Sequence, residues 1–169
     1  MKKVVLAISG LMLLASCEQA KFGYVDNVKL MDDYQEKVDL DASFKMKTDA
    51  LEKKRDSISN AFQIEAQAFQ LKAQSMTPEA AQQEYGVIQQ KGQIMGQQLQ
   101  QEEQTIRVAV QTEMDSLVNR VKDEVKAYGK SNGYNYILTG GNGGSVLYGK
   151  ESEDLTEEIV KILNDKYKK

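Results

Sequence analysis

Apolar residues in the middle of the chain recur every three to four positions, which predicts long amphipathic helices. Within the first stretch, Phe44, Leu51 and Ile58 are spaced seven apart. The alternate positions of the same heptads, offset by four residues, carry Thr48, Arg55, Phe62, Phe69 and Met76. Apolar residues at two positions of each heptad are typical of a helix packed along a neighbouring helix, and Thr48, Arg55 and Glu65 interrupt this seam.

A helix break is predicted at Thr77-Pro78-Glu79. Thr77 suits the N-cap, Pro78 suits the first helical position, and Glu79 interacts favourably with a helix N-terminus. The second helix is expected to run to Ser131, with Asn132 or Gly133 as its left-handed cap. Its seam slips by one residue after Ile106. The seam residues are Tyr85, Ile88, Met95, Leu99, Ile106, Val110, Met114, Leu117, Val121, Val125 and Tyr128.

Two consecutive helices joined by a tight break are expected to form an antiparallel hairpin. At 1.5 Å per residue, helices of about 44 and about 54 residues extend roughly 65 Å and 80 Å. The tip of this hairpin is rich in glutamine, with 14 between Gln63 and Gln104. Three glycines, Gly86, Gly92 and Gly96, weaken the second helix there, so we expect the tip to be more flexible than the base.

The two ends of the chain carry strand patterns. Residues 22–26 and 134–139 alternate or are rich in β-formers, a glycine-rich turn follows at 140–144, and residues 145–148 read as a third strand. Asp154 and Glu157 have the spacing of a capping box. The helix after it has one apolar face, formed by Leu155, Ile159, Ile162, Leu163 and Tyr167.

The predicted fold is therefore mainly α with a small β part. A single domain spans 22–169, in which the helical hairpin arm of residues 31–131 is inserted between the two halves of a sheet-plus-helix body, 22–30 and 132–169. A body of about 50 residues has a thin core and is marginal alone, so we expect assembly into an oligomer.

The N-terminus has the layout of a secretory signal. Lys2 and Lys3 precede an apolar run, Val4 to Leu14, which is too short to span a bilayer. The segment Leu14-Ala15-Ser16-Cys17 follows this run and resembles a bacterial lipobox. This predicts a signal peptide at 1–16, lipidation of Cys17, and an anchored linker at 17–21.

Composition narrows the functional classes. Removing residues 1–17 takes away two lysines, which leaves 20 basic residues against 25 acidic ones and a net charge of −5. Such a balance argues against nucleic-acid binding. The chain has no histidine, so the commonest general base and metal ligand are missing. We expect no catalytic residues, cofactor or metal.

One segment resembles an enzyme motif. Gly144 to Glu151 is close to a phosphate-binding P-loop, but Glu151 replaces the required Ser or Thr, and the middle residues read as a strand. Glu102 and Glu103 are explained by a solvated helix face rather than by acid–base catalysis. The enzyme hypothesis is therefore disfavoured.

Several segments, in order, resemble the Skp/OmpH family of periplasmic chaperones. The similar segments are Phe22-Gly23-Tyr24-Val25-Asp26, Tyr34, Tyr136-Ile137-Leu138 with the glycine-rich turn, Val146-Leu147-Tyr148, and Asp154-Leu155-Thr156. The resemblance covers nearly the whole mature chain. It implies a jellyfish-like homotrimer that acts as an ATP-independent holdase, binding unfolded outer-membrane proteins in the periplasm of a Gram-negative bacterium.

This chain departs from well-known family members, which are soluble and basic with lysine-rich tips. Here the chain is acidic, its tip is rich in glutamine, and a lipid anchor to the outer or inner membrane is predicted. Client-binding residues are not assigned by the sequence. Four apolar seam residues either contact clients or hold the two helices together, and seam spacing favours the second role. They are Phe62, Phe69, Met76 and Met95.

The alternative to a chaperone is a membrane-tethered coiled-coil spacer or adaptor of the cell envelope. A spacer predicts a continuous and rigid seam. The interrupted seam, the glycines at the tip and the separate body argue against that hypothesis.

Overall fold

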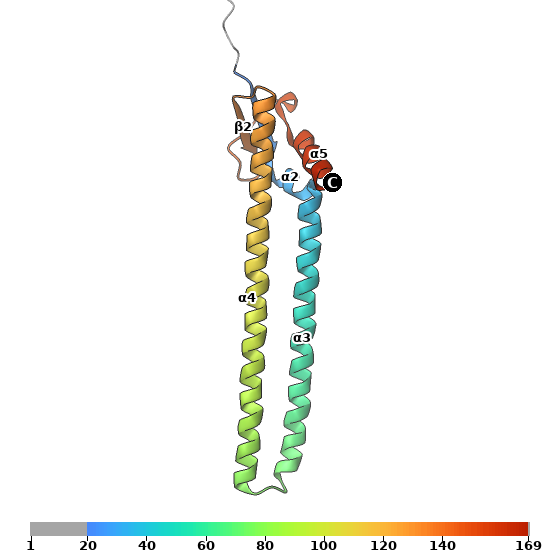
Figure 1. The fold of residues 1–169 in the computed structure, drawn as a ribbon, viewed down its shortest axis with the longest axis vertical. Helices are drawn as coiled ribbons and strands as arrows, with labels where there is room; N and C mark the ends of the chain where they lie inside the picture. Colours follow the sequence, from blue (N-terminus) through green and yellow to red (C-terminus); the bar gives the residue numbers. More distant parts are fainter. Residues whose placement is uncertain (1–19, 169) are drawn as a thin grey trace, which may run out of the picture. The chain divides into compact units, whose positions relative to one another are not determined.

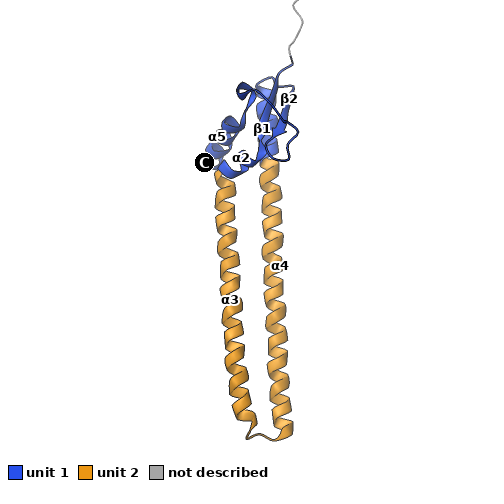
Figure 2. Cartoon of the chain, turned by 180° about the vertical axis from the view of Figure 1, so that it is seen from behind, with its two compact units in different colours: residues 1–34, 121–169 blue, residues 35–120 orange. Residues whose placement is uncertain are grey.

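The computed structural model describes residues 20–168, so the predicted signal peptide and Cys17 lie outside the described residues. The described chain forms two compact units (Figure 2). We call residues 35–120 the arm unit, and residues 20–34 with 121–168 the body unit. The elements are β1 (Phe22–Asp26), α2 (Asn27–Asp33), α3 (Gln35–Ala73), α4 (Pro78–Ser131), β2 (Tyr136–Gly140), the 3-10 helix η2 (Glu151–Glu153) and α5 (Thr156–Tyr167) (Figure 1).

The arm unit is an antiparallel helical hairpin, as predicted. Helices α3 and α4 lie side by side in both ribbon views (Figures 1 and 2). Ion pairs join the two helices, and four of them keep one register, because each step along α3 is matched by an equal step back along α4; a fifth, Arg55–Glu103 at 3.2 Å, is displaced by two residues. The four pairs in register are Glu36–Arg120, Lys54–Glu102, Glu65–Lys91 and Lys72–Glu84, with N···O distances of 2.5–2.7 Å.

The predicted seam is confirmed by burial. Phe44, Leu51 and Leu117 are buried, and most other seam positions are half-buried, whereas most of the intervening polar residues are exposed. The hairpin turn also forms as expected. The Thr77 hydroxyl accepts a hydrogen bond from the Ala80 N–H at 3.3 Å, so Thr77 caps α4.

The start of the first arm helix differs from the prediction. Instead of one helix of about 44 residues, the short helix α2 ends at Asp33 and α3 begins only at Gln35. Between them Tyr34 is extended and buried, with its ring edge-on to Tyr167 at 6.5 Å. The Asn164 amide donates to the Asp33 carbonyl at 3.0 Å. These tertiary contacts replace part of the stabilisation that the break between α2 and α3 removes. The spacing of apolar residues along the sequence could not predict them.

The body unit contains a two-stranded parallel sheet. Phe22 pairs with Tyr136 and Tyr24 with Leu138, and the connection between the strands contains the whole arm. On the other edge of β1, the Leu155 N–H donates to the Tyr24 carbonyl at 2.9 Å. The core lies on one face of this pair and includes Val25, Leu30, Leu155, Ile159 and Leu163, all at most 4% exposed.

The predicted third strand at 145–148 does not form. This segment makes one hydrogen bond to β2, from the Val146 N–H to the Thr139 carbonyl at 3.1 Å, and is otherwise irregular. Gly141 and Gly143 have φ of +76° and +80°, so the chain bends sharply after β2. A single hydrogen bond does not form a β-ladder. The apolar composition of 145–148 was therefore not sufficient to predict a strand.

The predicted capping box is also wrong. The Asp154 N–H donates to the Glu151 carbonyl, while the Glu157 carboxylate accepts from the Lys29 ammonium at 2.9 Å. Asp154 instead accepts from the Thr156 N–H at 2.9 Å and from its hydroxyl at 2.5 Å. The spacing of Asp154 and Glu157 predicted a reciprocal cap. Instead, Glu157 forms an ion pair with Lys29 on α2.

The C-terminal end of α4 forms at the predicted place. Gly133 has a φ of +70°, and the Tyr134 N–H donates to the Gly129 carbonyl at 2.9 Å. This bond pairs one of the carbonyls that a helix end leaves without a partner. The left-handed residue is therefore Gly133 rather than Asn132.

Candidate functional site: the exposed arm surface and the body face

The distal part of the arm unit is nearly free of uncompensated charge. Residues 57–101 include five charged side chains, and four of these form the two ion pairs Glu65–Lys91 and Lys72–Glu84. The fifth, Glu79, is in the first turn of α4, where a carboxylate is favourable. The tip therefore presents mainly neutral polar and apolar groups.

Apolar side chains also occur outside the seam. Val87, Ile94 and Val108 on α4 are 64%, 46% and 53% exposed, and Ile64 and Leu71 on α3 are 68% and 73% exposed. Val87 and Ile94, like Ile64 and Leu71, are seven residues apart, which places each pair on one face of its helix. These residues were not predicted as site residues. The signal that could have identified them is a second heptad set offset from the seam.

A groove lies between α3 and α4 near the tip. Its apolar lining comes from Ala68 and Phe69 on α3 and from Val87 and Ile88 on α4. The charged residues Glu65, Lys72 and Glu84 complete the lining, and each is in an ion pair. We call this feature the tip groove.

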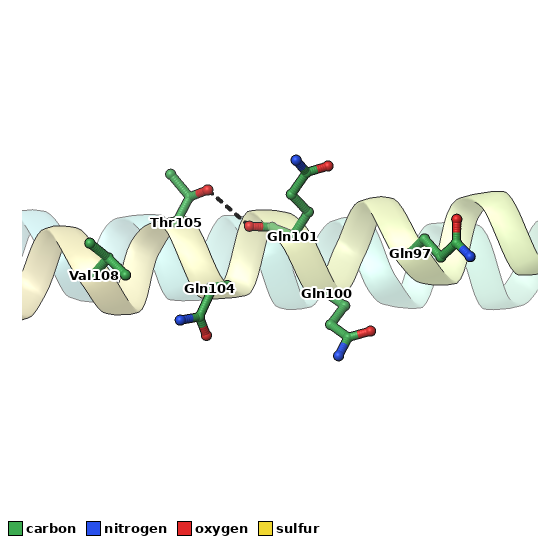
Figure 3. Close-up of a pocket in the computed structure, with 6 residues that line it drawn as sticks. All are labelled: Gln97, Gln100, Gln101, Gln104, Thr105 and Val108. Carbon is green, nitrogen blue, oxygen red and sulfur yellow. Dashed lines mark hydrogen bonds between the residues drawn. The ribbon is translucent and has the colours of Figure 1, made fainter.

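A second hollow follows α4 toward the base, and Figure 3 shows its lining. It is lined by Gln97, Gln100, Gln101, Gln104, Thr105 and Val108. The Thr105 hydroxyl donates to the Gln101 carbonyl at 2.9 Å, a bond within the helix backbone turn (Figure 3). Its lining offers side-chain amides, each with both donors and an acceptor.

The four apolar seam residues named as possible client contacts lie between the helices. Phe62, Phe69, Met76 and Met95 are all half-buried. The Phe69 ring stacks on Tyr85 at 6.0 Å, and the Lys91 ammonium lies 5.5 Å from the Phe62 ring centre. Their packing supports the structural role for these side chains. Their role in client binding stays a hypothesis.

The body unit exposes an apolar face on the sheet side opposite its core. Phe22 and Tyr136 stack at 5.9 Å and are 49% and 63% exposed, and Leu138 on the same face is 43% exposed. Beside them Leu147 and Tyr148 are 99% and 87% exposed. These five residues are called the body face. An open depression lined by four of them and by Tyr24 lies within it.

Two tyrosines of the body unit have shifted acidity. Burial, followed by the neighbouring Glu158 carboxylate, raises the pKa of Tyr128 far above its usual value. Slight burial, together with Asp154, Glu151 and other nearby carboxylates, raises the pKa of Tyr24. Both phenols are therefore held in the neutral form, which gives neither a nucleophile nor a base at neutral pH.

No group of three or more Cys, Asp or Glu residues between 20 and 168 is placed to hold a metal ion. Among the described helices, none combines the length and apolarity that crossing a bilayer requires. The P-loop-like segment is followed only by the one-turn helix η2, and a side chain at Gly149 would collide with the Tyr24 ring. The segment lacks the loop-to-helix context that a phosphate cradle needs.

The fold thus defines a class of proteins with a long helical hairpin inserted into a small α/β body. A family model described as "Outer membrane protein (OmpH-like)" matches residues 21–163, so the chain belongs to the OmpH-like family. Its fold is similar to a crystal structure assigned as an OmpH-like outer membrane chaperone from Caulobacter crescentus CB15. The TM-score is 0.78 at 14% identity, covering 87% of this chain and 85% of that chain. No curated protein matches the chain.

Proposed function

We propose that this protein is an ATP-independent holdase that binds unfolded outer-membrane proteins in the periplasm and prevents their aggregation. Membership of the OmpH-like family carries the proposal. The arm unit supports it, because its distal surface combines exposed apolar side chains with neutral amides. A surface of this kind suits many weak contacts with chains of different sequence, since it imposes no fixed charge pattern.

The mechanism requires no chemical step. Exposed strands of a client would contact the arms instead of another client, and each contact would be individually weak. Release follows when the client folds or is transferred, because the folded client buries the apolar surface that the arms bound. The proposed activity therefore needs neither nucleotide nor metal.

Assembly into a homotrimer is part of the proposal, and the body face supports it. An apolar surface with two side chains exposed above 80% is typical of an interaction site. The small core of the body unit would be extended by packing this face against copies of itself. A trimer would enclose a cavity for the client between three arms.

Anchoring through lipidated Cys17 is the remaining part of the proposal. The predicted signal peptide and lipobox support it, and the anchor would keep the chaperone at the outer or inner membrane. Mass spectrometry of the full-length protein from membranes should find a diacyl or triacyl modification at Cys17. Cys17→Ser should move the protein to the soluble periplasmic fraction, and unchanged membrane retention would contradict the anchor.

The first test of the holdase is an aggregation assay with an unfolded β-barrel membrane protein diluted from urea. The full-length chaperone should suppress light scattering at roughly one trimer per client, without ATP. Light scattering on a size-exclusion column should give a trimeric mass in the same buffer. No suppression at any ratio would overturn the proposal.

A membrane-tethered spacer is the second candidate, and the constant register of the ion pairs favours it. From Glu36–Arg120 to Lys72–Glu84 four ion pairs keep one register, as expected of a stiff rod. A spacer would bind one folded partner at fixed stoichiometry and leave client aggregation unchanged. The aggregation assay therefore separates the two candidates.

A further inference from the structure

The outer side of α4 carries a continuous uncharged surface that the seam does not use. We call Val87, Ile94, Gln97, Gln101, Gln104 and Val108 the outer strip, and all six are exposed. Ile94 follows Val87 after two helical turns, and Gln101 and Val108 continue the same seven-residue spacing. The strip therefore follows one side of the helix over about six turns.

The apolar content of the outer strip is too low to hold another helix. A packed helical interface has apolar residues at two positions in each heptad, as the α3–α4 seam does. In the outer strip only one position per heptad is apolar, and Gln101 replaces even that one. Stable pairing with the arm of a second copy is therefore disfavoured, whereas weak and repeated contacts fit this pattern.

Electrostatic capture does not fit the outer strip either. Between Tyr85 and Val108 the charged residues are Lys91, Glu102, Glu103 and Arg107, and each is in an ion pair: Lys91 with Glu65, Glu102 with Lys54, and Glu103 with Arg107. No basic cluster is present to recognise phosphate groups or the carboxylates of an acidic partner. The partner must be recognised by neutral contacts.

Neutral side-chain amides match the main chain of an unfolded polypeptide. Within residues 20–168 the amide groups of Gln97, Gln101 and Gln104 have no bonded partner, and each can both donate and accept. At Gly86, which directly precedes Val87, an added Cβ would meet nothing within 4 Å, so the helix surface beside the start of the strip is open. A client backbone can approach closely at such positions.

The tip groove adds a recess for a single apolar side chain. Val87 lines the groove and also begins the outer strip, so the two features are continuous. Phe69 and Ile88 supply the half-buried apolar lining. The tip groove can therefore bind one apolar side chain of a client, and the outer strip can contact the client segment next to that side chain.

We infer that the outer strip and tip groove form a client-capture surface for extended, uncharged segments of unfolded protein, and that capture is insensitive to salt. This inference rests on the proposed holdase function. It differs from the reading in which the seam residues Phe62 and Phe69 contact clients, because here the seam stays closed and the outer side of α4 binds.

The test replaces the apolar residues of the outer strip with glutamine, the residue type that surrounds them. Val87→Gln/Ile94→Gln/Val108→Gln removes three exposed apolar side chains, adds no charge and keeps good helix formers. The matched control is Val38→Gln/Met46→Gln, which changes exposed apolar residues of α3 near the base, 43% and 72% exposed. Binding of the unfolded β-barrel protein is measured by fluorescence anisotropy with the full-length chaperone, alongside its helicity and solution mass.

The strip variant should bind the client at least about tenfold more weakly, with helicity and mass unchanged, while the control binds like wild type. Raising NaCl from 50 to 500 mM should change wild-type affinity by less than about twofold, because few charged contacts are involved. Unchanged binding by the strip variant overturns the inference and leaves the holdase standing. A changed solution mass also overturns it, because the strip would then join copies of this chain. Absence of client binding by wild type overturns the holdase itself.

Discussion

At the scale of single residues, the body unit depends on one buried hydroxyl. Thr156 is fully buried, and its oxygen accepts from the Asp26 N–H at 2.9 Å while donating to Asp154. Asp26 in turn caps α2 by accepting from the Val28 and Lys29 N–H groups at 2.9 and 3.1 Å. One hydroxyl thus links the end of β1, the start of α2 and the start of α5.

We predict that Thr156→Val destabilises the body unit by about 1–3 kcal/mol, because it leaves the part-buried Asp26 N–H without a partner. Urea unfolding followed by circular dichroism measures the change. Thr156→Ser keeps the hydroxyl and is the matched control, with a smaller loss expected. A loss in Thr156→Ser with none in Thr156→Val would show that the methyl group, not the hydroxyl, matters.

A second prediction at this scale concerns Tyr128 at alkaline pH. Its pKa is raised in the folded protein, mainly by burial, above the value of about 10 expected when unfolded. Above pH 10 the unfolded chain loses this proton more readily than the folded one. Stability linked to Tyr128 is therefore fully present below pH 10 and falls as pH rises beyond it.

The measurement compares urea unfolding of wild type and Tyr128→Phe between pH 8 and pH 11. Wild type should lose stability more steeply above pH 10 than the variant, because phenylalanine has no proton to lose. Parallel profiles would contradict a raised pKa for this phenol. Other tyrosines and the lysines titrate in both proteins, so their contribution cancels in the difference.

At the scale of the elements, α3 and α4 were predictable because helix periodicity is a local and repeated signal. Each additional heptad in the seam, from Phe44 to Met76, supports the same orientation of the helix. The turn at Thr77-Pro78 was predictable for a similar reason, since capping and proline chemistry act within a few residues. The length of α3 was not, because burial of Tyr34 sets its start.

The glycines of α4 give a prediction at this scale. Gly86→Ala/Gly96→Ala should stabilise the arm unit by about 1 kcal/mol per site, because alanine is the better helix former and both positions are open. Thermal melting followed by circular dichroism should show a higher midpoint. Gly141→Ala is the contrasting control, since φ is +76° and the new Cβ would collide with the Asp26 carboxylate. A lower midpoint for the double variant would contradict open positions on α4.

At the scale of the whole molecule, the body face is the feature that a single chain leaves unexplained. Leu147 is 99% exposed and Tyr148 is 87% exposed, which is unfavourable unless another surface covers them. Self-association was predicted from the small core, but not through this face. The residues that form it depend on where the irregular segment after β2 lies.

We predict that Leu147→Ser/Tyr148→Ser weakens assembly at least tenfold, which corresponds to about 1.4 kcal/mol. Analytical ultracentrifugation over a concentration series of the full-length protein measures the dissociation. Val38→Ser/Met46→Ser, on α3, also removes two exposed apolar side chains and should leave assembly unchanged. A trimer that persists in the body-face variant at all concentrations would place the contact elsewhere.

The sequence by itself determined the mainly helical class, the hairpin, its turn and the two paired strands, because heptad spacing, caps and β-rich runs are local signals. It also indicated the OmpH-like family, through the order of several weak motifs. Only the tertiary structure decided which side chains remain exposed, where α2 ends, and that 145–148 does not join the sheet. Those outcomes depend on contacts between residues distant in sequence, such as Asn164 with Asp33 and Thr156 with Asp26, which no local pattern encodes.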